Sequence, residues 1–375
     1  MLIGVPREIK TLEFRVGLIP ASVRELTARG HAVIVETGAG GGIGVTDDDY
    51  RSTGARIAGS AAEVFADAEM IVKVKEPQPA ECAMLQPDQV LFTFLHLAAD
   101  PVQADGLKRS KAVAIAYETV TDNAGGLPLL APMSEVAGKM SIQVGAHCLE
   151  KRQGGVGVLL GSVTGVEAAH VVILGGGVAG SSAAEMAVGL GARVTVLERS
   201  LDRMRDLHHR FGARVNVAFS TADAVERYVA DADLVIGSVL IPGAAAPKLV
   251  DRDMLAAMRP GSVLVDTAID QGGCFETSRP TTHSDPTYVV DGIVHYCVTN
   301  MPGAVPRTSA FALNYAVLPH VIAIAEKGWR AAVGENEHLH RGLTVVDGTV
   351  VHPIVAEALG EHASAVEHLK KERAA

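Results

Sequence analysis

The hydrophobic positions of this chain fall into two series of short runs, separated by longer segments of mixed character. The first series occupies residues 2–5, 32–36, 70–74, 90–95 and 112–117. The second occupies residues 171–174, 193–198, 215–219, 233–240, 262–269 and 294–300. These runs are rich in Val, Ile and Leu and lack strict polar alternation, as is typical of strands buried on both faces of a parallel sheet. The pattern predicts an α/β fold with two doubly wound, Rossmann-like sheets.

The segments between the runs carry helix and turn signals. The first helix is predicted after Pro20, and helices are expected between all strands of the second series. Segment 134–151 repeats apolar residues at helical spacing and is predicted to be one helix, as are 308–326 and 353–371. The Asp-Gly pair at 347–348, flanked by valines, predicts a β-hairpin. The glycine cluster at 38–44 is best interpreted as a loop.

The order of the two series predicts how the domains are arranged. A chain of 375 residues is long enough for two domains. The second series, residues 131–305, is predicted to be a nucleotide-binding domain inserted into a discontinuous substrate domain formed by 1–130 and 306–375. Two connecting helices would join them, and a cleft between the domains is the expected substrate site.

Composition excludes several kinds of partner. The net charge of −10 argues against nucleic acid and anionic membranes, because both favour a basic surface. Four scattered cysteines without CxxC spacing predict neither a disulfide framework nor a zinc site and favour a reducing cytosol. The uncharged run 308–325 is about long enough to cross a bilayer, but Asn314, Pro319 and His320 interrupt it. We expect a soluble protein without a membrane partner, and no metal, since the histidine pairs 208–209 and 338/340 are interpreted as solvated.

The clearest motif lies at residues 171–200. Gly175, Gly177 and Gly180 fit G-x-G-x-x-G after a strand and before a helix, and Glu198 ends the following strand. The first glycine permits a tight turn, the second lets a pyrophosphate approach the backbone, and the third lets helix and strand pack closely. This context predicts dinucleotide binding; the alternative is a close helix contact in a domain without a ligand.

Residues at the carboxyl ends of the strands are the next candidates, because ligands of open parallel sheets bind there. In the second series these residues are Ser220, Val239, Leu240, Asp270 and Asn300. Ser220 and the backbone after Ser238 can flank adenosine, whereas Asp270 and Asn300 come from later strands and can approach the nicotinamide end.

In the first series, three consecutive strands end in ionisable residues, Lys75, His96 and Glu118, and Arg15 follows the first strand. Each has a simpler interpretation: a solvated lysine, a core histidine, a capping glutamate and a surface arginine. Together they suit oxidation of a small amino or hydroxy acid. Arginine can hold a carboxylate in fork geometry, lysine can polarise an oxygen, and histidine can exchange a proton.

Several segments resemble alanine dehydrogenases, in order along essentially the whole chain. They are GVPREIKTLEFRVGLIP, VKVKEP, FTFLHLA, PMSEVAGKMS, GGGVAG and VTNMPGAVPRTS. The resemblance implies NAD-dependent, reversible oxidation of L-alanine to pyruvate and ammonia, in the cytoplasm, by a homohexamer.

The resemblance also implies roles for individual residues. Arg15 and Lys75 correspond to contacts of the substrate carboxylate and carbonyl, His96 to the acid/base residue, and Asp270 to a second catalytic acid. The implied cofactor contacts are Ser134, Gly175, Gly177, Val178, Gly180, Glu198, Arg203, Ser220, Val239, Leu240, Thr267, Ala268, Ile269, Asp270, Arg279, Val298, Thr299, Asn300 and Met301. Which of His96 and Asp270 handles which proton does not follow from the sequence.

Two other functions stay open. The nucleotide-binding part of proton-pumping transhydrogenases is similar over most of the chain, but that family typically lacks a lysine at position 75 and a histidine at position 96, and this chain has both. A regulator that senses the nucleotide without turnover is the other alternative. Glu198 predicts a preference for NAD over NADP, although Arg199 and Arg203 are of the type that accommodates the 2′-phosphate. A side activity on glyoxylate is plausible, because one methyl group distinguishes substrates by only about 1–3 kcal/mol.

Overall fold

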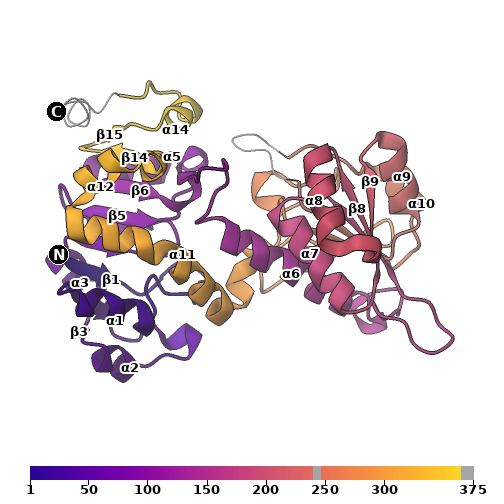
Figure 1. The fold of residues 1–375 in the computed structure, drawn as a ribbon, viewed down its shortest axis with the longest axis horizontal. Helices are drawn as coiled ribbons and strands as arrows, with labels where there is room; N and C mark the ends of the chain where they lie inside the picture. Colours follow the sequence, from indigo (N-terminus) through magenta and orange to yellow (C-terminus); the bar gives the residue numbers. More distant parts are fainter. Residues whose placement is uncertain (240–245, 365–375) are drawn as a thin grey trace. The chain divides into compact units, whose positions relative to one another are not determined.

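The computed structural model describes residues 1–239 and 246–364, and the chain divides into two compact units. Unit 1 consists of Met1–Met133 and the described part of Val305–Ala375, and unit 2 is Ser134–Ala304 (Figure 1). Each unit is built on its own sheet. The long helix α6 (Ala131–Cys148) contains the boundary between the units.

The sheet of unit 1 has eight strands in the order β15-β14-β6-β5-β4-β1-β2-β3. The strands are β1 (Leu2–Val5), β2 (Ala32–Glu36), β3 (Arg56–Ala58), β4 (Met70–Val72), β5 (Val90–Thr93), β6 (Val113–Ala116), β14 (Leu343–Val346) and β15 (Thr349–Val350). All neighbours are parallel except the hairpin β14–β15, which adds to β6 in the antiparallel direction. The helices of this unit are α1 (Pro20–Ala28), α2 (Asp47–Ser52), α3 (Ala61–Asp67), α4 (Pro79–Cys82), α5 (Pro101–Ser110), α11 (Pro306–Lys327), α12 (Trp329–Glu335), α13 (Glu337–His340) and α14 (Pro353–Ala358).

The sheet of unit 2 has seven strands in the order β12-β13-β11-β10-β7-β8-β9. They are β7 (His170–Leu174), β8 (Arg193–Glu198), β9 (Val215–Phe219), β10 (Leu234–Gly237), β11 (Val263–Asp266), β12 (Thr287–Val290) and β13 (Ile293–Tyr296). Among the described strands of this unit, only β12 runs antiparallel, against β13. The helices are α7 (Val178–Gly189), α8 (Leu201–Phe211), α9 (Ala222–Ala230) and α10 (Arg252–Ala257). Without β12, the order is that of a dinucleotide-binding sheet.

The strand order reverses once in each sheet. In unit 1 the reversal lies between β1 and β4, and in unit 2 it lies between β7 and β10. At such a switch point the loops diverge to opposite sides of the sheet and leave a crevice at the carboxyl ends of the strands. The predicted doubly wound α/β fold is therefore confirmed, and each sheet has one place that favours a ligand.

The apolar helix α11 belongs to the core of unit 1. By length and composition it could span a membrane, and 44% of its most apolar window is buried inside the protein. Asn314, which interrupts the apolar run, is fully buried, and its side-chain oxygen accepts a hydrogen bond from the Ile19 amide at 2.8 Å. The side chain of Asn314 thus joins α11 to Ile19, the residue before α1, as expected of a helix packed against protein.

The positions of the predicted strands are confirmed, but several of the strands end earlier than predicted. The bounds predicted for β1, β2, β8 and β9 are confirmed, whereas β4, β5, β6, β10, β11 and β13 end before their apolar runs do. The described residues that follow the strand ends in those runs belong to the loops that carry the candidate site. Apolarity persists there because these loops are buried too.

Three expectations were wrong or incomplete. No α-helix connects β11 to β13; a 3-10 turn, η6 (Ile269–Gln271), and the antiparallel strand β12 occupy that crossover. The last helix was predicted over 353–371, but α14 ends at Ala358, and Gly360 with φ +72° turns the chain. Residues 365–371 of that prediction lie outside the described residues. The short strand β3 was missed. The hairpin at Asp347-Gly348 is confirmed, with φ +45° and +79°.

Candidate active site

The glycine loop of unit 2 follows β7 at the switch point. Gly175 adopts φ +96°, and a methyl group at Gly180 would come within 1.8 Å of the Gly175 carbonyl oxygen. Only glycine fits these two positions. At Gly177, which caps the N-terminus of α7, an added methyl group would meet nothing within 4 Å. The backbone at Gly177 is thus open on its outer side, where a pyrophosphate can approach the helix N-terminus. These residues fit a bound dinucleotide.

Glu198 stabilises the conformation of this loop through hydrogen bonds to its carboxylate. One carboxylate oxygen accepts a hydrogen bond from the Gly176 amide at 2.7 Å, and the other accepts from the amides of Arg199 and Ser200 at 2.6 and 2.8 Å. The oxygen that accepts from Gly176 still has one lone pair for a ribose hydroxyl, whereas the other oxygen already accepts two hydrogen bonds. The amide of Ser220 donates to the backbone carbonyl of Glu198 at 3.0 Å, which places the end of β9 beside that of β8.

Two side chains border the glycine loop. The side chain of Arg203, about half exposed, passes Gly176, since its Cγ lies 3.4 Å from where a methyl group on that glycine would stand. Val239 lies on the other side, with its Cγ2 2.9 Å from such a position on Gly175. Leu240, also predicted to contact the cofactor, lies outside the described residues.

Ser134 stands one helical turn before Gly138 on α6. A methyl group on Gly138 would come within 2.0 Å of the Ala179 carbonyl oxygen, so α6 lies directly against the first turn of α7. Residues four apart share a helix face. The half-buried Ser134 therefore faces the same end of α7 as the glycine loop.

The turn after β11 carries Asp270 on the exposed part of η6. It is shaped by Asp266, a fully buried residue that sequence reasoning missed. The Asp266 carboxylate accepts hydrogen bonds from the amides of Ala268 and Cys274 at 3.0 and 2.7 Å and from the Ser278 hydroxyl. Burial raises the pKa of Asp266, and these hydrogen bonds oppose that effect. Thr267 anchors the start of the turn, because its hydroxyl and amide both donate to the Gly237 carbonyl.

The turn after β13 contains the remaining predicted cofactor residues. Val298 and Met301 are buried, and the Thr299 amide donates to the Thr281 carbonyl at 3.2 Å. Asn300 has φ +57°, and its carbonyl accepts from the Gly303 amide at 2.8 Å. Arg279 is exposed, and its guanidinium lies 4.0 Å from the centre of the Tyr288 ring.

In unit 1, Arg15 is buried, with 2% of its surface exposed, and is not a surface charge. Its guanidinium forms a two-pronged ion pair with Glu13, at 2.7 Å from Nε and 2.5 Å from Nη2. A methyl group on Gly17 would come within 2.2 Å of the Val72 carbonyl oxygen. The loop that carries Arg15 thus returns to the end of β4, on the opposite side of the switch point from β1.

Lys75 follows β4 at the same switch point. Only 12% of its side chain is exposed, which contradicts the interpretation as a solvated lysine, and its ammonium lies 3.7 Å from the Glu76 carboxylate. Burial raises the pKa of Glu76, but the charges of Lys75 and Lys10 outweigh it, so the net pKa is lowered. The Thr93 hydroxyl donates to the Lys75 carbonyl at 3.0 Å, so the chain at Lys75 lies beside the end of β5.

His96 follows β5 and is exposed, which contradicts the interpretation as a core histidine. Its ring stacks on Phe94, with centroids 5.7 Å apart and planes 3° apart. The ring nitrogens make no hydrogen bond within residues 1–239 and 246–364. The carboxylate of Glu118 accepts hydrogen bonds from the amides of Leu95 and His96. Glu118 therefore caps the end of β5, as its simpler interpretation proposed.

A buried ion cluster beneath Lys75 was also missed. Lys73 is fully buried, and its ammonium lies 2.9 Å from Glu8 and 2.7 Å from Glu81. Burial raises the pKa of Glu8, with the charge of Lys73 opposing it. Glu8 also accepts a hydrogen bond from the Val74 amide at 2.6 Å, so the cluster ties the loop after β1 to the segment that leads to Lys75. The sequence signal for this cluster was Lys73, a lysine inside the otherwise apolar run 70–74.

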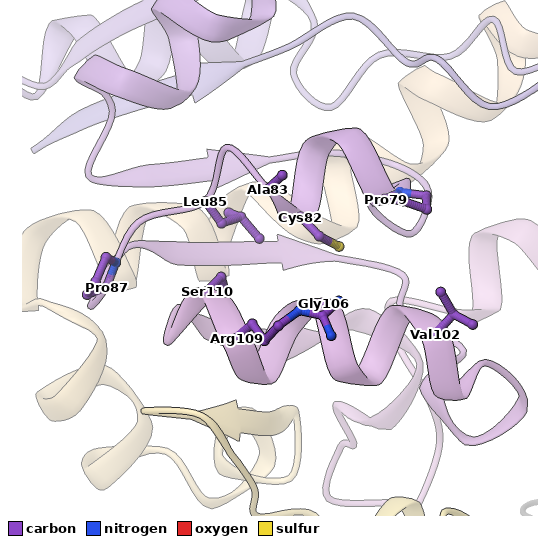
Figure 2. A pocket seen from close by; sticks show the side chains of 9 residues that line it. All are labelled: Pro79, Cys82, Ala83, Leu85, Pro87, Val102, Gly106, Arg109 and Ser110. Atoms are coloured by element: carbon purple, nitrogen blue, oxygen red, sulfur yellow. The ribbon is translucent and has the colours of Figure 1, made fainter.

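A separate pocket of about 370 Å³ lies between α4 and α5 in unit 1 (Figure 2). It is lined by Pro79, Cys82, Ala83, Leu85, Pro87, Val102, Gly106, Arg109 and Ser110, none of which belongs to the predicted site. Burial raises the pKa of the Cys82 thiol to about 11, so it is not a reactive thiolate. Within the described part of the chain, no group of His, Cys, Asp and Glu residues could hold a metal ion.

The fold and these groups define a class of protein: a two-unit α/β protein with a Rossmann dinucleotide loop in one unit and a cluster of buried ionic groups at the switch point of the other. Family models identify it further. The model "Alanine dehydrogenase/PNT, N-terminal domain" matches residues 4–137, and "Alanine dehydrogenase/PNT, C-terminal domain" matches residues 141–353. The chain belongs to the alanine dehydrogenase/PNT family, and this membership implies a pyridine nucleotide cofactor.

Individual relatives agree with this assignment. The chain is 58% identical to an alanine dehydrogenase of Halomonas elongata, over 96% of this chain and 97% of that one. A solved structure named as L-alanine dehydrogenase has 52% identity and a TM-score of 0.93, covering 96% of this chain and 99% of that one. A transhydrogenase from Sinorhizobium meliloti is more distant, with 25% identity and a TM-score of 0.81 over 94% of this chain and 99% of that one.

Proposed function

We propose that this protein catalyses the NAD-dependent oxidative deamination of L-alanine to pyruvate and ammonia, and the reverse reaction. The observation that carries the proposal is that Arg15, Lys75 and His96 follow the carboxyl ends of three neighbouring strands, β1, β4 and β5. The names of relatives that are 51–58% identical over nearly the full chain point to the same substrate.

Arg15 and Lys75 hold the substrate in this proposal. A guanidinium can bind a carboxylate through two parallel hydrogen bonds. Glu13 fixes the plane of the Arg15 guanidinium through two contacts, so little side-chain entropy is lost when the substrate binds. Lys75 supplies a second cation that can polarise the carboxylate or the developing carbonyl oxygen. Burial of Arg15 and partial burial of Lys75 strengthen their attraction for an anion.

NAD is held by unit 2, with its pyrophosphate at Gly177 and the α7 N-terminus and its adenine ribose at Glu198. The remaining contacts belong to Ser134, Val178, Arg203, Ser220, Val239, Leu240, Arg279 and the turns 267–270 and 298–301. When bound, NAD accepts the hydride that leaves Cα of alanine. For each turnover, alanine, NAD and one water become pyruvate, ammonium, reduced NAD and one proton.

His96 and Asp270 move the protons. Loss of hydride from Cα leaves an iminium, which water attacks to form a carbinolamine that collapses to pyruvate and ammonia. Water must lose a proton in the attack, and the amine must gain one before it leaves. The exposed His96 imidazole and the exposed Asp270 carboxylate are both of the residue type that carries out such general acid–base steps.

The proposal also covers the domain boundaries, the location and the oligomeric state of the protein. Residues 1–130 and 306–375 form the substrate domain and residues 131–305 form the NAD domain. The active form is a cytoplasmic homohexamer that acts on small molecules only. Light scattering on the purified protein tests the hexamer, which predicts a mass six times that of the 39.1 kDa chain.

Two substitutions test the assignment of the substrate site. Lys75→Ala and His96→Ala each abolish turnover, because they remove a substrate contact and a proton carrier, respectively. Both leave the dissociation constant of NAD unchanged, because both residues belong to unit 1. Turnover like that of the wild type in either variant would remove that residue from the mechanism. Loss of NAD binding together with activity would instead indicate damaged folding.

A further inference from the structure

The turn that carries Asp270 is bound along its length by a second segment of unit 2. Residues 246–250 run beside residues 271–275 in the parallel direction, with a bridge between Val250 and Phe275. The Ala246 amide donates to the Gln271 carbonyl at 2.9 Å, and the Leu249 amide donates to the Cys274 carbonyl at 2.7 Å. These backbone hydrogen bonds do not involve the carbonyls of Gly272 and Gly273, and the only described backbone amide that donates to the Phe275 carbonyl is that of Ser278, at 3.2 Å.

Lys248 supplies further donors to these carbonyls. Its ammonium donates hydrogen bonds to the carbonyls of Gly272, Gly273 and Phe275, at 3.0 Å for the last two. An ammonium group has three donors, and all three are used here. Gly272 and Gly273 have φ +90° and +79°, which only glycine adopts readily, and this conformation turns both carbonyls towards one point.

The turn is also held by the buried carboxylate of Asp266, through the amides of Ala268 and Cys274. Within the turn, the amides of Gln271 and Gly273 donate to the Ala268 carbonyl. Carbonyls bound by a cation and amides bound by an anion leave the backbone around Asp270 few alternative conformations. No hydrogen bond or ion pair within the described chain joins Lys248 to Asp270 itself, so any effect of Lys248 on Asp270 passes through the backbone.

We propose that Lys248 is a positioning residue for Asp270: its ammonium fixes the 271–275 backbone so that the Asp270 carboxylate stands where its proton transfer requires it. The inference rests on the proposed function, in which Asp270 carries a proton. A displacement of about 1 Å at such a group can lower a rate about 100-fold. Thr267 keeps the first half of the turn on the sheet independently of Lys248, so cofactor contacts there are retained.

Lys248→Met tests the proposal, because methionine keeps much of the side-chain volume and removes all three donors. The expected result is a fall in kcat of about 10- to 100-fold, with a much smaller change in the dissociation constant of NAD, because Thr267 keeps the first half of the turn in place. Amide hydrogen exchange should accelerate at 271–275 and not elsewhere in unit 2. Lys248→Arg restores donors and should recover most of kcat. Lys327→Met, which removes a surface ion pair with Glu335 in unit 1, is the matched control and should change neither quantity.

The combination with Asp270→Asn separates positioning from a merely structural role. If Lys248 acts through Asp270, Lys248→Met lowers kcat much less in the Asp270→Asn background than in the wild type. An equal fold-loss in both backgrounds, or a Lys248→Met enzyme with wild-type kcat and wild-type exchange, overturns the proposal. If Asp270→Asn alone has the kcat of the wild type, Asp270 has no part in the proposed mechanism. That result overturns the role of Asp270 and, with it, the positioning role of Lys248.

Discussion

The carboxylate of Glu118 accepts a hydrogen bond from the backbone amide of His96 at 2.6 Å. His96 has φ +49°, a left-handed conformation that non-glycine residues adopt only when their surroundings impose it. Its ring stacks on Phe94, which itself packs edge-on against Tyr117, the neighbour of Glu118. The orientation of the imidazole is thus determined by the backbone and by stacking.

Glu118→Ala should lower kcat by about 10-fold or more. The amides of Leu95 and His96 lose their acceptor, and the left-handed conformation costs about 1–3 kcal/mol, so the loop relaxes and the ring moves. Glu118→Gln keeps an oxygen acceptor and should lose much less. Steady-state kinetics with L-alanine and NAD measure both variants. If Glu118→Ala has the kcat of the wild type, Glu118 does not hold His96 in its active position.

The buried ion cluster makes a prediction about stability. Lys73→Met leaves Glu8 and Glu81 buried without their cation and should lower the free energy of unfolding by about 3–5 kcal/mol. Lys139→Met is the matched control. Its ion pair with Glu185 is about half exposed and should contribute less than about 1 kcal/mol. Denaturant unfolding measures the free energy of unfolding of both variants. Equal losses in the two variants would show that burial does not make the ion pairs of Lys73 more important than an exposed one.

Glu198 predicts the choice of cofactor. Three backbone amides hold its carboxylate in place, so it cannot swing away from a 2′-phosphate. Like charges in contact are strongly unfavourable, and kcat/KM should be at least about 10-fold higher with NAD than with NADP. Glu198→Gln removes the repulsion and should lower the ratio of kcat/KM with NAD to kcat/KM with NADP. This holds even if the variant binds both cofactors less tightly. Equal or better efficiency of the wild type with NADP would show that Arg199 and Arg203 determine the choice.

A buried histidine makes stability depend on pH. Burial lowers the pKa of His295, which is fully buried, with one ring nitrogen near the Ile293 carbonyl and the other near the Thr277 hydroxyl. Below about pH 6.5 the unfolded chain binds a proton at this position and the native protein does not. Stability therefore falls as the pH is lowered, by at most about 1.4 kcal/mol per pH unit for this residue.

His295→Gln should flatten that dependence, because glutamine keeps a donor and an acceptor and does not titrate. The thermal midpoints of the wild type and the variant, measured from about pH 7 to about pH 5.5, should approach each other on acidification. Buried His170 and half-buried His31, His320 and His352 also have pKa values lowered by desolvation, so the variant keeps part of the slope. Parallel curves would show that His295 is not held neutral.

Sequence reasoning succeeded where the signal is local. Parallel strands buried on both faces need continuous apolar runs, and the glycine loop needs glycine at Gly175 and Gly180 for reasons visible within a few residues. The contacts that arrange the site join residues far apart in sequence. Glu118 is 22 residues from His96, and Lys73 is 65 residues from Glu8. No periodicity or spacing reports such pairs before the fold is known.

The wrong predictions have a related cause. The apolar runs continue past β4, β5 and β11 because the loops after these strands are also buried, so hydrophobicity alone cannot mark where a strand ends. Strand β12 was missed for a different reason: the hairpin signal Asp291-Gly292, which follows the β-branched and aromatic residues of 287–290, was overlooked. Asp266 was correctly placed in a strand, since it is the last residue of β11, but the role of its carboxylate in organising the following turn was missed.

The most direct test of the account is to mix the purified protein with L-alanine and NAD and follow the absorbance of reduced nicotinamide. The account predicts an increase that requires both compounds, with pyruvate, ammonia and reduced NAD formed in equal amounts. The reaction should reverse when pyruvate, ammonia and reduced NAD are supplied. Binding of NAD without any change in absorbance, in protein that unfolds cooperatively on heating, would contradict the account and identify the chain as a nucleotide-binding protein without this activity.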